Sequence, residues 1–115
     1  MQGIVKLGMR SEALKGHLDL LLLAVVAVGP MHGYALIEEL RRASSDAFDL
    51  PEGTIYPALH RLERAGLLQS DWTTVDGRRR RVYSLTSDGR GAMERQRQEW
   101  KAFLGAMQLV LGAER

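Results

Sequence analysis

The segment from Gly53 to Leu68 carries the side chains best suited to binding another macromolecule. Its apolar residues Ile55, Leu59 and Leu62 recur at helical spacing, and Gly66 stands where such a helix would end. The opposite face carries the hydrogen-bonding and basic side chains Thr54, Tyr56, His60, Arg61 and Arg64. A short helix with such a face can enter the major groove of DNA and contact base edges. We therefore interpret this segment as a recognition helix.

A run of four arginines, Arg78 to Arg81, follows Gly77 where the chain is expected to turn through a hairpin. Guanidinium groups bind phosphates strongly and without sequence preference. In an extended strand, neighbouring arginines point to opposite faces, so the four cannot all contact DNA in the same way. A charge run is usually a solvated surface, but its position after a recognition helix favours a basic wing.

Enzymatic chemistry finds no support in this sequence. It contains no cysteine, and its histidines, His17, His32 and His60, belong to different expected elements, so neither a metal cluster nor a nucleophilic triad is indicated. No glycine pattern for a phosphate-cradling loop is present. We expect no enzyme, no metal and no cofactor. The longest apolar run, Leu20 to Val28, is too short to span a bilayer, and we expect a cytoplasmic protein with no membrane association.

The elements that would position these side chains fit one domain of 115 residues. Periodicity predicts helices at 11–28, 33–43 and 53–65, strands at 68–74 and 82–85, and a long last helix capped by Thr86. This order predicts a mainly α fold with a small two-stranded β-wing. Residues 1–10 are an N-terminal extension that can remain disordered, 11–85 a winged helix-turn-helix domain, and 86–115 a C-terminal dimerisation helix. Translation could start at Met1 or at Met9.

The first and last helices carry more apolar surface than a chain of this size covers by itself. In the last helix Met93, Trp100 and Met107 are spaced by seven residues, as in a coiled-coil seam. This helix either folds back onto the domain or pairs with a second copy, and we favour a homodimer. The expected interface comprises Leu18, Leu22, Met93, Trp100, Phe103, Leu104 and Met107. The other tryptophan, Trp72, is expected to pack between the wing and the helices.

Three segments in order resemble a known protein family, and together they are more specific than any one motif alone. In order, GPMHGYALIEEL, LPEGTIYPALHRLERAGLL and GRRRRVYSLTSDGR closely resemble the PadR family of bacterial transcriptional regulators, over about Leu14 to Arg90. The short length resembles the compact branch with a single C-terminal dimerisation helix. The resemblance implies a homodimeric repressor that binds double-stranded DNA at an inverted-repeat operator and leaves it when an effector binds.

The resemblance also implies which residues contact DNA. They are Tyr34, Thr54, Tyr56, Pro57, His60, Arg61, Arg78, Arg79, Arg80, Arg81 and Tyr83. Tyr34 could instead be a packed aromatic residue, and Arg61 could pair with Glu63 instead of contacting a base or phosphate. Two positions depart from the family pattern: Pro51 replaces a usual serine before the recognition helix, and His60 replaces a usual lysine or arginine.

Compact relatives can hold flat aromatic ligands at the dimer interface. This makes Trp100, Met93 and Phe103 candidate contacts for a small hydrophobic or aromatic effector, although they could equally form a plain dimer core. Two other functions stay open: a winged-helix module that binds protein without sequence-specific DNA binding, and a ligand sensor whose DNA contacts are secondary.

Overall fold

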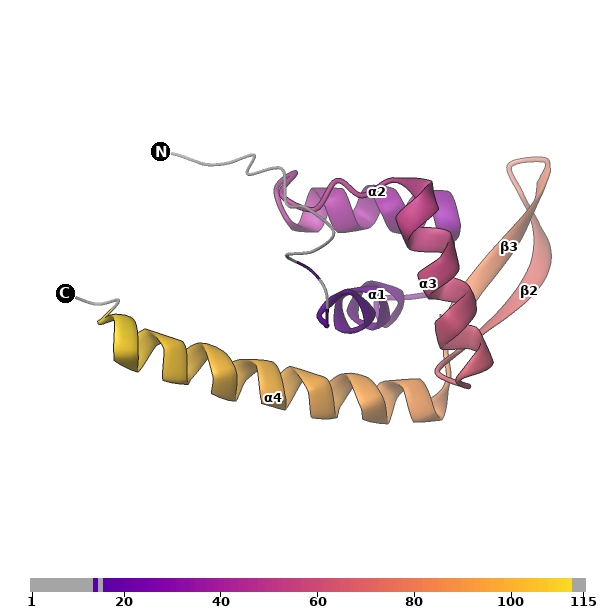
Figure 1. Cartoon of the computed structure of the whole chain (residues 1–115). Coiled ribbons are helices and arrows are strands. Elements are labelled where there is room, and N and C mark those ends of the chain that lie inside the picture. Colours follow the sequence, from indigo (N-terminus) through magenta and orange to yellow (C-terminus); the bar gives the residue numbers. More distant parts are fainter. Residues whose placement is uncertain (1–13, 15, 113–115) are drawn as a thin grey trace.

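The computed structural model describes residue 14 and residues 16–112. Along them the elements are α1 (Leu18–Val26), β1 (Met31–His32), α2 (Gly33–Ala43), α3 (Glu52–Arg64), β2 (Leu68–Val75), β3 (Arg78–Leu85) and α4 (Ser87–Leu111). Figure 1 shows α1, α2 and α3 gathered into one body, with the β2–β3 hairpin projecting from it and α4 running past it. The predicted fold class, a winged helix with a long C-terminal helix, is confirmed. The predicted extension, residues 1–10, lies outside the described residues.

The core lies where the first three helices meet the base of the hairpin. Side chains that are at most 2% exposed come from every one of these elements: Leu22, Leu23, Val26, Leu36, Ile55, Ala58, Leu59, Leu62, Leu68 and Tyr83. Among the described residues no polar or charged side chain other than the Tyr83 phenol is buried in it. The core is therefore held by apolar packing, and it fixes the orientation of α3 against α1 and α2.

The first helix is shorter than its apolar pattern predicts. Gly16 has a φ of 89°, a left-handed backbone conformation that interrupts a right-handed helix, and α1 begins only at Leu18. The expected start at Ser11 or Glu12 lies outside the described residues. Leu22 is fully buried in the chain's own core, so its assignment to the dimer interface is wrong.

The sheet has three strands in the order β1-β3-β2, one more than the sequence indicates. The added strand pairs Met31 with Tyr83 and His32 with Val82. Two residues are too few to show an alternating pattern, which is why the sequence predicts only a connection there. The hairpin turns at Asp76 and Gly77, whose φ values of 52° and 77° match the two-residue turn that suits twisted strands.

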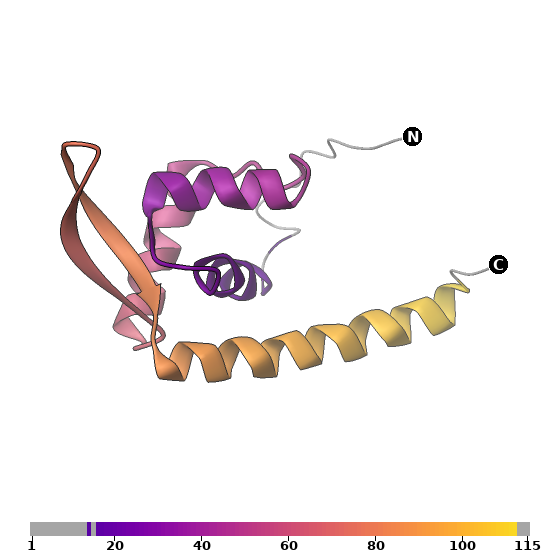
Figure 2. The ribbon, with the colours of Figure 1, turned by 180° about the vertical axis from the view of Figure 1, so that it is seen from behind.

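Helix α4 is anchored at its start and extends away at its end. The Thr86 hydroxyl accepts a hydrogen bond from the Gly89 N–H (2.9 Å) and donates one to the Gly66 carbonyl (2.7 Å). Met93 is 3% exposed inside the core, so its assignments to the dimer interface and to the effector site are wrong. Beyond this buried start, α4 continues well past the body (Figure 2). No helix in the described part of the chain combines the length and apolarity needed to cross a membrane.

Candidate nucleic-acid interface

One face of α3 points to solvent along its whole length. Ile55, Ala58, Leu59 and Leu62 are buried, and the opposite face carries the exposed residues Gly53, Pro57, His60 and Arg64 at intervals of four, three and four. We call these four residues the outer face of α3. Arg64 is not among the DNA contacts expected from the sequence, although its spacing from His60 indicates this face.

The helix begins without a side-chain cap. Pro51 is the N-cap residue, with extended backbone angles, and its carbonyl accepts hydrogen bonds from the Thr54 and Ile55 N–H groups. Within the helix Pro57 has no N–H, so the carbonyl of Gly53 lacks its usual helical donor. The outer face therefore presents a carbonyl acceptor as well as imidazole and guanidinium groups.

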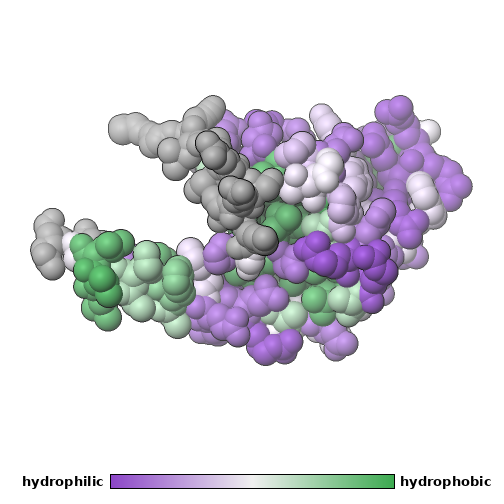
Figure 3. Space-filling view, viewed as in Figure 1, coloured by the Kyte–Doolittle hydropathy of each residue, from purple (hydrophilic) through white to green (hydrophobic). Residues whose placement is uncertain are grey.

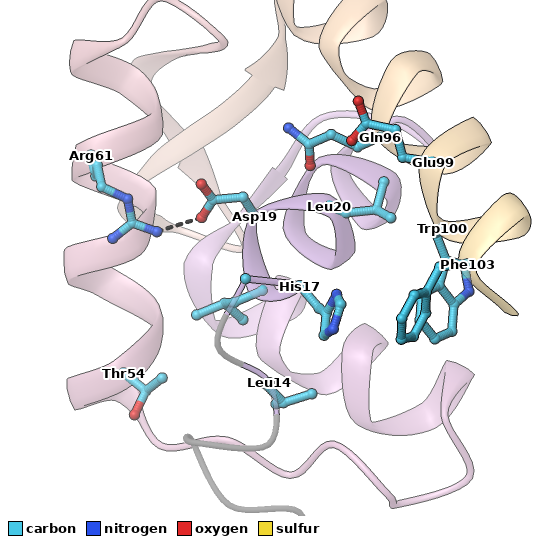
Figure 4. A pocket seen from close by; sticks show the side chains of 12 residues that line it. Leu14, His17, Asp19, Leu20, Thr54, Arg61, Gln96, Glu99, Trp100 and Phe103 are labelled. Atoms are coloured by element: carbon cyan, nitrogen blue, oxygen red, sulfur yellow. Dashed lines mark hydrogen bonds and ion pairs between the residues drawn. The ribbon is translucent and has the colours of Figure 1, made fainter. Parts of the chain in front are cut away.

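Arg61 does not lie on the outer face. Its guanidinium forms an ion pair with Asp19 of α1, and with Thr54 it lies on the side of α3 that faces α1 (Figure 4). The expected alternative partner, Glu63, instead accepts a hydrogen bond from the Ser70 hydroxyl (2.7 Å) and lies 3.7 Å from the Arg81 guanidinium. Arg61 therefore joins two helices, and Glu63 joins α3 to the wing.

Tyr56 connects α3 to the start of α2. A Cβ atom added at Gly33 would lie 2.3 Å from the Tyr56 hydroxyl oxygen, so only glycine allows this close approach. Burial raises the pKa of Tyr56, which keeps the hydroxyl protonated as a hydrogen-bond donor. Next to it, Tyr34 is 54% exposed on the first turn of α2, with its ring stacked near that of His32.

His32 caps α2 through its ring. Its Nδ1 accepts a hydrogen bond from the Ala35 N–H at 3.2 Å, which requires that nitrogen to be unprotonated. Burial, and then the positive charge of Arg80, lower the pKa of His32 below its ordinary value of 6.5. His32 therefore caps the start of α2 through an unprotonated ring nitrogen.

The wing carries its arginines along β3 rather than at the turn. Arg78 pairs with Val75 beside the turn, and Arg81 pairs with Trp72 further along. Trp72 is 55% exposed, so the expectation that it packs between the wing and the helices is wrong. Tyr83 is 1% exposed because the base of β3 lies against the helices, and its assignment to DNA contact is also wrong.

A hollow of about 910 Å³ opens between α1, α3 and α4. Trp100 and Phe103 line it from α4, with ring centroids 5.8 Å apart, and His17 meets the Trp100 ring edge to face at 5.3 Å. Thr54 and Arg61 line the opposite side (Figure 4). Two of the three expected effector residues therefore lie at one hollow, and Met93 is absent from its lining.

The distal half of α4 exposes a continuous apolar surface. Trp100, Phe103, Leu104 and Met107 are 39–53% exposed, and Leu109, Val110 and Leu111 are 70–84% exposed. Figure 3 shows this hydrophobic patch on the end of α4 that extends from the body. Contiguous apolar surface of this kind is unusual on a monomeric protein. Leu18, the remaining α1 candidate for the dimer interface, is partly buried against the core at the start of α1.

The comparisons with known proteins agree on one family. The model of the transcriptional regulator PadR-like family matches residues 22–95. A transcriptional regulator of Mycobacterium tuberculosis is 48% identical over 67 residues, which are 58% of this chain and 60% of that protein. The crystal structure of a PadR family transcription regulator from Clostridium difficile is 31% identical with a TM-score of 0.75, covering 84% of this chain and 99% of that one. A PadR-like regulator from Bacillus cereus is 26% identical with a TM-score of 0.78, covering 88% and 97%.

Proposed function

The chain belongs to the PadR-like family of transcriptional regulators, and we propose that it is a homodimeric repressor that binds an inverted-repeat operator in double-stranded DNA. The observation that carries this proposal is the exposed outer face of α3 beside a basic wing. Figure 2 shows the N-terminal end of α2 next to α3 and the wing, so all three can meet one duplex. Such a regulator acts in the cytoplasm, where bacterial DNA lies.

The proposed contacts divide into base contacts and phosphate contacts. His60 and Arg64 on the outer face would meet base edges in the major groove, next to Pro57. On the wing, Arg78, Arg79 and Arg80 form no ion pair with any residue that the structure describes, so their charges are available to phosphates. The Tyr34 and Tyr56 hydroxyls would supply further donors at the start of α2.

Dimerisation would bury the apolar surface of α4. Trp100, Leu104 and Met107 lie on one stripe, three or four residues apart, and form the seam of two paired helices. Phe103 and the Leu18 side chain of α1 would extend the interface on either side. A symmetric dimer presents two recognition helices, and an inverted-repeat operator matches that symmetry.

An effector in the hollow would affect DNA binding through α3 itself. A flat hydrophobic ligand stacked on Trp100 would come close to the Arg61–Asp19 ion pair opposite. If the ligand favours one spacing between α3 and α1, it shifts the dimer toward a form that fits the operator less well. The hollow therefore supports release of DNA by a small aromatic effector.

A titration against DNA from upstream of the protein's own gene, and against a scrambled duplex, tests the proposal at two salt concentrations. We expect a preference for the upstream DNA that persists at the higher salt, because base contacts do not depend on counterion release. Equal binding to both duplexes that disappears at higher salt would contradict a sequence-specific repressor. That result would favour a winged-helix protein-interaction module.

A further inference from the structure

The wing carries an exposed aromatic side chain that contacts two arginines. The guanidinium carbons of Arg79 and Arg81 lie 5.0 Å and 5.5 Å from the centre of the Trp72 ring. These distances are within the range of cation–π interactions. Trp72 and Arg81 are directly paired across β2 and β3, so both side chains lie on the same face of the hairpin, and Arg79 lies two residues further along that face.

This face is basic and apolar at once, and its outer residue Arg79 forms no ion pair with any residue that the structure describes. Trp72 is 55% exposed. Among the described residues, Glu63 is the acidic residue that pairs with this cluster, and its carboxylate lies 3.7 Å from the Arg81 guanidinium. A tryptophan that served only to fill the fold would be buried, as Tyr83 is on the same face of β3. The cluster therefore has the composition of a binding surface.

We infer that Trp72 is a DNA-contacting residue of the wing, with its indole ring against the sugar edge of the duplex and Arg79 and Arg81 on the flanking phosphates. The DNA backbone alternates anionic phosphates with apolar deoxyribose faces, which matches an apolar ring beside two guanidinium groups. Contact with the ring also restrains the two arginines and reduces the side-chain freedom that they lose on binding. This inference rests on the proposed DNA-binding function.

The emission of Trp72 on DNA binding is the direct test. The chain has two tryptophans, so a Trp72→Phe variant reports Trp100 alone, and the difference from the unchanged protein reports Trp72. Duplex DNA from upstream of the gene is added while tryptophan emission and acrylamide quenching are followed, and labelled DNA gives the binding curve independently. We expect Trp72 to become protected from acrylamide along the same curve, and the Trp72→Phe protein to show little change.

Affinity gives a second readout that does not depend on fluorescence. We expect DNA affinity of Trp72→Ala to fall about fivefold to tenfold. Because this change removes no charge, the slope of log affinity against log salt should change by no more than the loss of about one phosphate contact would change it. Trp72→Phe, which keeps a ring, should recover most of the loss. Thermal unfolding of both variants shows whether the fold is retained.

The outcomes are distinguishable. DNA binding with unchanged quenching of Trp72 and unchanged affinity of Trp72→Ala would overturn this inference and leave the proposed function standing. Failure of the unchanged protein to bind any duplex would overturn the proposed function and this inference with it.

Discussion

The Arg61 guanidinium of α3 forms an ion pair with the Asp19 carboxylate of α1, across 42 positions of sequence. Both side chains line the hollow beneath Trp100, and both are more than a third exposed. The pair therefore contributes little to stability, and its position makes it a link between α3 and the hollow proposed to hold an effector.

Replacing Arg61 should affect DNA discrimination less than replacing its neighbour. His60→Ala removes a side chain from the outer face, and we expect the preference for operator over scrambled DNA to fall about tenfold, as for loss of one specific contact. Arg61→Ala should change that preference less than about threefold. In a double-mutant cycle with Asp19→Asn, the coupling free energy between the two side chains in unfolding should not exceed about 1 kcal/mol. Competition binding and urea unfolding measure these effects. A larger loss of discrimination in Arg61→Ala would return that residue to the DNA surface.

Gly33 should tolerate no side chain. An alanine Cβ there would lie 2.3 Å from the Tyr56 hydroxyl oxygen and 2.6 Å from the nearest ring carbons, so the Tyr56 side chain must move. We expect Gly33→Ala to lose about 1–3 kcal/mol of unfolding free energy. Gly29→Ala is the matched control, because no atom lies within 4 Å of its added Cβ. Adding Tyr56→Ala to Gly33→Ala should remove the clash. If the single Gly33→Ala protein is as stable as the control, Tyr56 does not pack on α2 as described.

Stability should fall as the solution becomes acidic, partly through His32. Burial and Arg80 lower its pKa in the folded chain, so the unfolded chain takes up the proton first. The stabilisation from the neutral cap is present above the ordinary pKa of 6.5 and is lost as pH falls through the lower folded pKa. His32→Asn keeps a capping acceptor that does not titrate. Urea unfolding at several pH values should show a smaller acid loss in this variant, and an identical loss would exclude His32 as a contributor.

Arg79 of the wing, which forms no ion pair with any described residue, should set part of the salt dependence. Arg79→Ala removes one phosphate contact, and the slope of log affinity against log salt should become shallower by about 0.9 on all duplexes. Lys101→Ala removes the same charge from the exposed surface of α4, far along the chain from the wing, and serves as the control. Equal slopes for the two variants would indicate that only net charge matters.

Disrupting the α4 stripe should separate the dimer. Leu104→Glu with Met107→Glu places two carboxylates in the proposed seam, and we expect a monomer by sedimentation together with weaker operator binding. Gln98→Glu adds charge on the opposite side of the same helix and should leave the dimer intact. A dimer that persists in the double variant would require a different interface.

Local order was predictable from the sequence because it depends on residues close together in the chain. Apolar periodicity predicts the bounds of α2, and a hydroxyl at a helix start predicts the Thr86 cap. An Asp-Gly pair predicts the turn between β2 and β3. The outer face of α3 was only partly recognised. Its helix was predicted, but Arg61 was placed on the face that Arg64 occupies.

Tertiary structure decided which side chains are covered and which partners they take. Tyr83 and Trp72 lie on the same face of adjoining strands, and only their distance from the helical body buries one and exposes the other. Likewise, Glu63 lies two residues from Arg61 in sequence, yet the fold brings Asp19 to Arg61 and the wing to Glu63. The sequence by itself determined the elements apart from β1 and the bounds of α1, through interactions a few residues long. Burial and ion pairing depend on contacts between distant segments, and only the packed chain specifies them.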